Sequence, residues 1–309
     1  MTLRVTQSMI NTQLQRNLNL NMSRMAKLQE QLSTGRLINR PSDDPVGITY
    51  SLRYRSELAA NEQYRKNVDA ALSWLNFTDT MIGQAGDVIH RIQELTVQGS
   101  TGTNPQDAMD NVAREILQLR DQLVNIGNSQ LAGKYVFNGE QFDIAPYSEQ
   151  NENPNPDPNV TDYANVVTDS GQVRYEVGPG VVLAINVTGN ELFGSPTDND
   201  NLFRVIDRIA TALQNGDKDA ASDELANLES RLEKILTVRA EVGAKTNRVE
   251  LMENRLKDLE LNATDLLSRT EDADMAELLM RSKIEENIYN ASLAVGAKII
   301  VPSLVDFLR

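Results

Sequence analysis

Apolar residues recur every three or four positions near the start of the 309-residue chain, and this spacing is typical of a helix with one buried seam. The seam consists of Leu14, Leu18, Asn21, Met25, Leu28 and Leu32. Gly35 follows it and can end the helix in the left-handed conformation. A second helix is expected to begin at Pro45, because Asp44 is a suitable N-cap and proline is favoured at the first helical position. It could run to about residue 98, and the pattern predicts a third helix over residues 108–126.

The strongest periodicity lies in the C-terminal third of the chain. From Leu228 to Leu266 the seam positions keep an unbroken 3-4 spacing, with Arg231 and Lys245 as polar members. Five heptads without proline predict one long helix of about 75 Å at ~1.5 Å per residue. Polar residues in such a seam usually fix its register at a cost in stability. The spacing continues more weakly toward the C-terminus, and the acidic run 271–274 is expected to form a joint.

The middle of the chain has a different, β-type pattern. Asn138-Gly139 favours a two-residue hairpin turn between the short runs 135–137 and 141–144. Runs rich in β-branched residues, separated by glycines, follow at residues 166–167, 173–177 and 181–187. Together these runs predict a small β insert.

Helical periodicity returns after the insert, with Asp200 or Asn201 as the candidate N-cap and Asn215-Gly216 as the next break. The predicted fold is mainly α, a long antiparallel helical bundle or coiled coil built from N- and C-terminal segments, with a small inserted β domain. Both termini are expected at the same end. The predicted parts are a terminal helical assembly domain (1–44 and 268–309), a long-helix bundle domain (45–145 and 200–267) and the β insert (146–199).

The composition excludes several classes of function. A net charge of −14 disfavours nucleic-acid binding, because phosphates would repel the protein. There is no cysteine, and the single histidine, His90, has no second histidine or thiolate with which to form a metal site or a catalytic triad. The run 198–201 lacks the glycine and distal glutamate of a calcium loop. We therefore predict no enzyme activity, no catalytic or metal-binding residue and no cofactor.

Membrane insertion is not expected either, because no run is apolar and long enough to span a bilayer. The nearest candidate, residues 291–305, contains Gly296, Lys298 and Pro302. Residues 1–15 alternate polar and apolar side chains and do not resemble a cleavable secretory signal.

The terminal segments carry few charges. No acidic residue precedes Glu30, and only Lys298, Asp306 and Arg309 are charged after Ala291. Two interpretations follow from this pattern. The terminal helices could complete the bundle of the monomer, or they could become ordered only against neighbouring copies, so that polymerisation offsets the entropy of ordering.

The stretch from Leu32 to Gly47 resembles the joint motif of the flagellin superfamily, and its form Asn39-Arg40-Pro41-Ser42-Asp43-Asp44-Pro45 is similar to the hook-associated protein 3 branch. The candidate joint residues are Gly35, Arg36, Asn39, Arg40, Pro41, Asp43, Asp44 and Pro45. Residues 3–9 and 303–308 are also similar to this branch, and residues 91–98 and 271–277 resemble landmarks of the superfamily. The resemblance covers roughly residues 1–145 and 200–309.

The resemblance implies a structural component of the bacterial flagellum, a junction ring between hook and filament formed by intersubunit packing of the terminal helices. The candidate assembly interface comprises Leu14, Leu18, Met25, Leu28, Leu32, Ile284, Ile288, Ala291, Val295 and Ile299. Expected partners are further copies of the chain, the hook-side junction protein, flagellin and a cytoplasmic export chaperone that covers the C-terminal stripe. The resemblance also implies export through the flagellar type III apparatus to an extracellular location.

Three alternatives remain at this point. The chain could be a flagellin, the bulk subunit of the filament. It could carry an enzyme in the β insert, or it could be an unrelated coiled-coil scaffold, which would not need the terminal motifs. Within the joint, Arg36, Arg40 and Arg53 are candidates for pairing with acidic residues of a neighbouring subunit.

Overall fold

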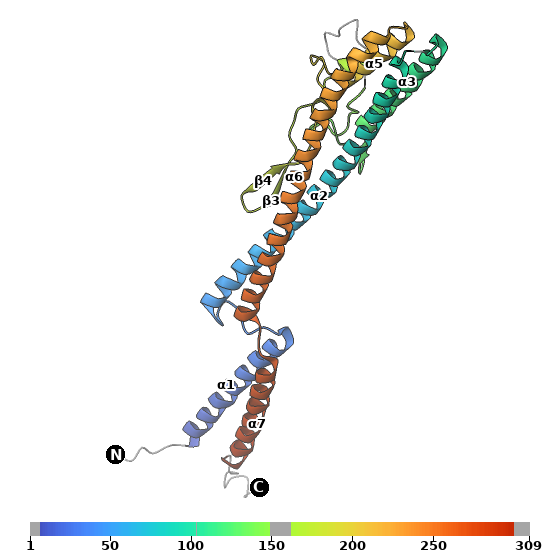
Figure 1. The fold of residues 1–309 in the computed structure, drawn as a ribbon. Helices are drawn as coiled ribbons and strands as arrows, with labels where there is room; N and C mark the ends of the chain where they lie inside the picture. Colours follow the sequence, from blue (N-terminus) through green and yellow to red (C-terminus); the bar gives the residue numbers. More distant parts are fainter. Residues whose placement is uncertain (1–6, 103, 149–161, 300–309) are drawn as a thin grey trace. The chain divides into compact units, whose positions relative to one another are not determined.

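The computed structural model describes residues 7–102, 104–148 and 162–299, and most of these are helical (Figure 1). The helices are α1 (Gln7–Thr34), α2 (Pro45–Ser100), α3 (Gln106–Gly127), α4 (Gly189–Phe193), α5 (Leu202–Gln214), α6 (Lys218–Glu271) and α7 (Met275–Ile299). The strands are β1 (Gln130–Leu131), β2 (Lys134–Tyr135), β3 (Arg174–Gly178) and β4 (Val181–Ala184). The predicted fold class, long helices with a small β part, is confirmed.

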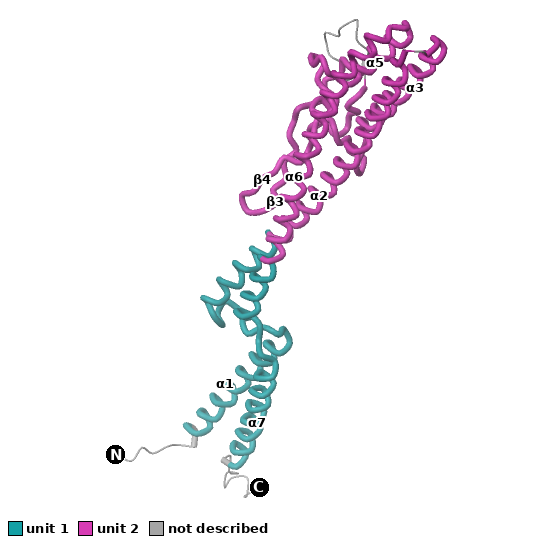
Figure 2. The backbone as a smooth tube through the Cα atoms, viewed as in Figure 1, with its two compact units in different colours: residues 1–60, 259–309 teal, residues 61–258 magenta. Residues whose placement is uncertain are grey.

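The chain forms two compact units, which are coloured separately in Figure 2. Unit 1 contains residues 1–60 and 259–309, and unit 2 contains residues 61–258. Both α2 and α6 contribute to both units, and the residues expected to form the β insert belong to unit 2. The finer three-part division expected from the sequence stays a prediction.

Unit 2 is built around the antiparallel helices α2 and α6. Asn61 of α2 donates a hydrogen bond to the carbonyl of Leu256 at 2.8 Å, and Arg239 of α6 pairs with Asp79 at 2.9 Å. The seam predicted in α6 is buried as far as Leu256, with Leu228, Ile235, Val242, Val249 and Leu256 each at most 1% exposed. Its last part is not buried, since Leu259 and Leu266 are 41% and 44% exposed. The α2 seam residues Val68, Leu75, Ile82 and Ile89 are buried as well.

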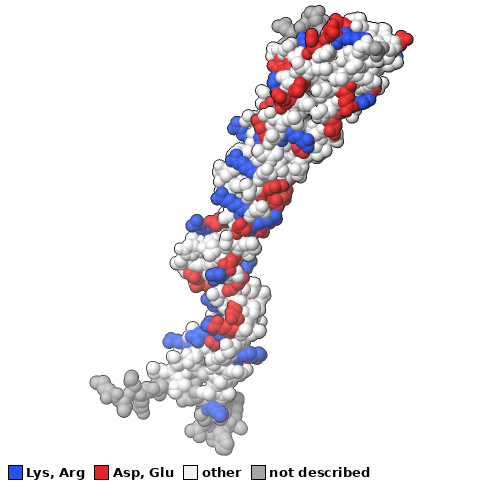
Figure 3. Space-filling model, viewed as in Figure 1, with Lys and Arg blue, Asp and Glu red and all other residues white. Residues whose placement is uncertain are grey.

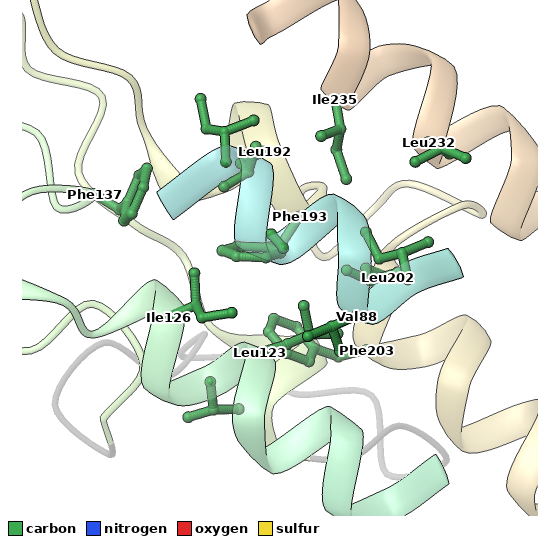
Figure 4. Packing of buried hydrophobic residues seen from close by; sticks show 14 of the residues in the cluster. Val88, Leu123, Ile126, Phe137, Leu192, Phe193, Leu202, Phe203, Leu232 and Ile235 are labelled. Atoms are coloured by element: carbon green, nitrogen blue, oxygen red, sulfur yellow. The ribbon is translucent and has the colours of Figure 1, made fainter. Parts of the chain in front are cut away.

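Aromatic residues of the insert and of α5 complete the core of unit 2 (Figure 4). Phe193 and Phe203 lie 5.4 Å apart between their ring centroids, and Tyr147 meets Phe203 edge to face at 5.0 Å. Offset and edge contacts of this kind are the arrangements that aromatic rings prefer. Tyr147, Phe193 and Phe203 thus gather where the insert meets the helices.

The structure corrects the expected position of the first hairpin. β1 and β2 pair across Ala132 and Gly133, which both have positive φ, and not across Asn138-Gly139. A turn does form at Asn138, where the N–H of Gln141 donates to its carbonyl at 2.9 Å. However, the buried Asn138 amide donates to the Ile144 carbonyl and accepts from the N–H of Asp169. These hydrogen bonds fasten the turn to surrounding loops. The N–H of Tyr135 donates to the carbonyl of Phe142 at 3.0 Å, but among the described residues the runs 135–137 and 141–144 do not form the paired strands of the predicted hairpin.

The second pair of strands follows the sequence pattern. β3 and β4 are antiparallel, with Tyr175 opposite Leu183. β3 overlaps the run 173–177 and ends one residue after it, and β4 lies within the run 181–187. The run 166–167 directly follows a 3₁₀ turn over Asp162–Asn165 and belongs to neither pair of strands. Asn201 is the N-cap of α5, with its side chain accepting from the N–H of Arg204, as predicted.

Candidate assembly interface

The terminal helices α1 and α7 lie side by side and run antiparallel within unit 1 (Figure 1). A Cβ added to Gly296 near the end of α7 would lie 2.7 Å from Leu14 Cδ2 near the start of α1. Further along the pair, Arg24 Nη1 lies 4.0 Å from Glu285 Oε1. The start of α1 and the end of α7 therefore lie together, as predicted, and the two helices pair with each other.

The predicted seam of α1 faces α7. Its members Leu14, Leu18, Met25, Leu28 and Leu32 are half-buried, and Asn21 and Gln31 on the same side are buried. The side of α7 that is turned inward is built largely from small or polar residues. Its buried or half-buried positions are Leu278, Ser282, Glu285, Tyr289, Ser292 and Gly296.

The apolar stripe of α7 is turned outward. Ile284, Ile288 and Val295 are 51%, 42% and 54% exposed, and Ala291 between them is exposed too. The remaining residue of the predicted stripe, Ile299, is the last residue of α7, and its side chain lies outside the described residues. Burial against solvent normally selects the apolar side of a helix, so this stripe has the character of a surface that another helix covers.

An apolar groove of about 650 Å³ joins part of the stripe to α1. It is lined by Met9, Ile10, Gln13, Leu14 and Asn17 of α1 and by Ile288, Ala291, Ser292 and Val295 of α7. The structure thus brings one predicted α1 residue, Leu14, into the same groove as three predicted α7 residues. Met25, Leu28 and Leu32 do not line this groove.

The joint consists of two chain breaks that hydrogen-bond to one another. α1 ends before Gly35, whose φ of +70° is the left-handed value expected there. The N–H of Leu37 donates to the carbonyl of Glu271 at 2.7 Å, and the N–H of Ala273 donates to the carbonyl of Gly35 at 3.0 Å. The break between α1 and α2 is therefore fastened to the break between α6 and α7.

The paired aspartates of the joint motif have separate structural tasks. Asp43 Oδ2 accepts from the N–H groups of Asn39 and Arg40 at 3.3 and 3.0 Å, which closes the exposed turn that contains Pro41. Asp44 Oδ1 accepts from the two N–H groups that begin α2, each at 3.0 Å, and Pro45 is the first residue of that helix. Asp44 is thus the N-cap that the sequence predicts.

The environment of Asp43 makes the joint sensitive to acid. A hydrogen bond from Lys27, whose Nζ lies 2.8 Å from Asp43, lowers the pKa of this carboxyl; burial opposes the shift, and the N–H groups of Arg40 and Asn39 add to it. A carboxylate whose pKa is lower in the folded state stabilises the fold above its unfolded pKa, near 4, and loses that contribution as the pH falls through the folded value.

We therefore expect Asp43→Asn to lower the melting temperature above about pH 4 and to lose this effect at lower pH. The measurement is the difference in melting temperature between wild type and variant at each pH from 6 to 2, which cancels the titration of all other groups. A gap that stays constant over this range would contradict the role of Asp43.

The three arginines considered for intersubunit pairing each have a partner within the chain. Arg36 pairs with Glu271 at 2.9 Å, Arg40 with Glu30 at 3.1 Å, and Arg53 with Glu57 at 3.0 Å. Pairing with a neighbouring subunit stays a prediction. Glu271, which pairs with Arg36, is a candidate functional residue that the sequence did not single out. The sequence pointed only to the acidic run 271–274 to which it belongs.

The described residues contain no group of three or more histidine or acidic side chains arranged to hold a metal ion. Among the helices in the described ranges, none is both long and apolar enough to cross a membrane.

Comparison with known proteins decides the family. Residues 5–142 match the bacterial flagellin N-terminal helical region, and residues 225–308 match the bacterial flagellin C-terminal helical region, so the two matches together span most of the chain. This chain belongs to the flagellin family. Members of this family are structural proteins of the bacterial flagellum and not enzymes, so the enzyme and the unrelated-scaffold alternatives are set aside.

Two alternatives remain within the flagellin family, a hook-associated protein and a flagellin, and the chain is similar to proteins of both kinds. Flagellar hook-associated protein 3 of Escherichia coli K12 is 27% identical over 94% of this chain and 95% of its own length. Flagellin of Bacillus subtilis is 26% identical over 91% of both chains. Sequence identity alone therefore does not separate the two kinds of subunit.

Two solved structures share the fold. The flagellar junction protein of Legionella pneumophila superposes with a TM-score of 0.59 over 72% of this chain and 100% of its own, at 16% identity. FlgL of Bacillus cereus gives a TM-score of 0.57 over 70% of this chain and 99% of its own, at 20% identity.

Proposed function

We propose that this flagellar protein forms the junction ring between hook and filament and that its terminal helices assemble the ring by packing against those of neighbouring copies. The observation that carries this proposal is the exposed apolar stripe of α7 beside the groove shared with α1. Exposed apolar area destabilises a monomer by roughly 25 cal/mol per Å² relative to a covered surface. A second copy is a fitting occupant, since the family consists of subunits of polymeric structures.

The distribution of charge supports assembly through unit 1. Unit 1 has 13 basic and 13 acidic residues, whereas unit 2 has 17 basic and 31 acidic residues, so the whole net charge of −14 belongs to unit 2. The surface of the α1/α7 pair is mostly uncharged in the view of Figure 3. Copies can pack closely through a neutral unit, whereas dense packing of a unit with a net charge of −14 would be opposed by self-repulsion.

The proposed partners and location follow from the similarity to hook-associated protein 3 and from the apolar stripe of α7. The similarity to hook-associated protein 3 favours contact with the hook-side junction protein on one side of the ring and with flagellin on the other. Before assembly, the stripe of α7 offers an apolar face to a cytoplasmic export chaperone. Export through the flagellar type III apparatus would then deliver the chain to the outside of the cell.

The test separates a junction protein from a flagellin. Purified protein is added in excess to isolated hooks and to filament fragments, and the added length is measured by electron microscopy. We expect a short zone of constant length that does not grow with further protein. Flagellin added to the same fragments is the control and should give long polymers. Long polymers of this chain would show that it is a filament subunit.

A further inference from the structure

Glu271, the last residue of α6, is a buried acid at the centre of the joint. Its side chain is only 3% exposed, and a single carboxylate oxygen, Oε1, is shared by two guanidinium groups. Arg36 Nε lies 2.9 Å away, and Arg55 Nη2 donates a further hydrogen bond. One arginine comes from the connector after α1 and the other from α2, so the carboxylate joins two separate segments to the end of α6.

The backbone around Glu271 makes the same connection. Its carbonyl accepts from the N–H of Leu37, and the following residues pair with Gly35 and Arg36 in a short antiparallel bridge. Within unit 1, the chain passes twice between the α1/α7 pair and the adjoining ends of α2 and α6. Both passages contact Glu271 or its neighbour.

Charge-assisted hydrogen bonds to an arginine are directional, because the planar guanidinium fixes the geometry of its donors. A buried carboxylate is also strongly destabilised when its partners are removed, so the three groups tend to stay together. We propose that Glu271 is a positioning residue: its shared carboxylate sets the angle between the α1/α7 pair and the adjoining ends of α2 and α6. This inference rests on the proposed function, since that angle aligns the apolar stripe of α7 with a neighbouring copy.

The test uses a charge-removing variant of equal size, Glu271→Gln. Because the chain has no cysteine, Ser23→Cys on α1 and Ser56→Cys on α2 give two unique spin-label positions, both exposed and both in unit 1. Asp265→Asn is the matched control, since it removes one acid from the same helix at a site that is 57% exposed. Far-UV circular dichroism reports whether each variant keeps its helices.

We expect Glu271→Gln to keep its helicity, to broaden the distance distribution between the labels, and to weaken assembly on the order of tenfold, the factor that one charge-assisted hydrogen bond supplies. Asp265→Asn should change neither measurement, and Glu271→Asp, which restores the charge, should recover part of the narrow distribution. If Glu271→Gln unfolds the chain, Glu271→Asp alone serves the same measurement, with a shifted or broadened distribution expected.

An unchanged distance distribution would overturn the positioning role. A broadened distribution together with normal assembly would overturn the inference that this angle aligns the apolar stripe of α7 with a neighbouring copy. Failure of the unsubstituted chain to assemble at all would instead overturn the proposed function, and the label distances would still decide whether Glu271 sets the angle.

Discussion

Arg231→Ala is expected to lower the free energy of unfolding by about 3–5 kcal/mol, the range seen when one partner of a buried ion pair is removed. Arg231 lies in the seam of α6 and is only 2% exposed. Its Nε donates to the carbonyl of Asp200 at 2.9 Å, and its Nη2 donates to Asp200 Oδ1 at 2.7 Å. Truncation would leave these acceptors without their donor and would open a cavity in the core of unit 2.

The surrounding structure is shaped around this side chain. Gly194, between α4 and α5, has a φ of +96°, and a Cβ at this position would lie 2.6 Å from Arg231 Nη2. Burial raises the pKa of Asp200, but the contacts with Lys234 and Arg231 outweigh it, so the pKa stays below its ordinary value. Arg231 therefore fastens the connector between α4 and α5 to α6 through an ionised partner.

The measurement is urea unfolding of the variant against wild type, with Arg239→Ala as the matched control. Arg239 also lies on α6 and pairs with an aspartate, Asp79, but the two side chains are 46% and 41% exposed. Exposed pairs contribute at most about 1 kcal/mol, so the control should lose little stability. Equal losses for the two variants would show that burial of the Arg231 pair is not what stabilises unit 2.

Much of the fold could be predicted because helix seams are local patterns. The α6 seam as far as Leu256, the Asp44 and Asn201 caps and the left-handed Gly35 follow from residues near one another in sequence, and all are found in the structure. The two polar residues of the α6 seam have different surroundings in the structure. Arg231 is buried with an ionic partner, whereas Lys245 lines a groove of about 430 Å³, with both polar and apolar walls, beside the insert.

Features that depend on distant residues escaped prediction. The Asn138-Gly139 turn was expected to form a hairpin, but the position of Asp169, which fastens it to a loop, is not visible in its local sequence. The Glu271 site is similar, since its partner Arg55 lies 216 positions away in the chain. Periodicity also did not reveal which side of α7 pairs with α1. The inward side of α7 has no side chain at Gly296, which lets α1 approach closely there, and the apolar stripe remains exposed.

Because the apolar stripe of α7 faces outward, we expect charged substitutions in it to have a large effect on assembly. The double variant Ile284→Asp/Ile288→Asp should abolish assembly and leave the monomer folded. Both side chains are about half exposed in the monomer, so two carboxylates there remain solvated and disturb little packing. In an assembled contact the same carboxylates would be taken out of water without partners, at a cost of at least about 3 kcal/mol, or more than a hundredfold in affinity.

The measurement is the yield of assembled protein on isolated hooks, with circular dichroism and melting temperature as checks on the monomer. Asn290→Asp/Ala297→Asp is the matched control, because it adds the same charge at exposed positions of α7 on the other side of the helix from the stripe. If any added negative charge on α7 opposes assembly, both variants will assemble poorly. If copies meet through the stripe, only the first variant will assemble poorly. Normal assembly of the first variant would show that the outward stripe of α7 is not the surface through which copies meet.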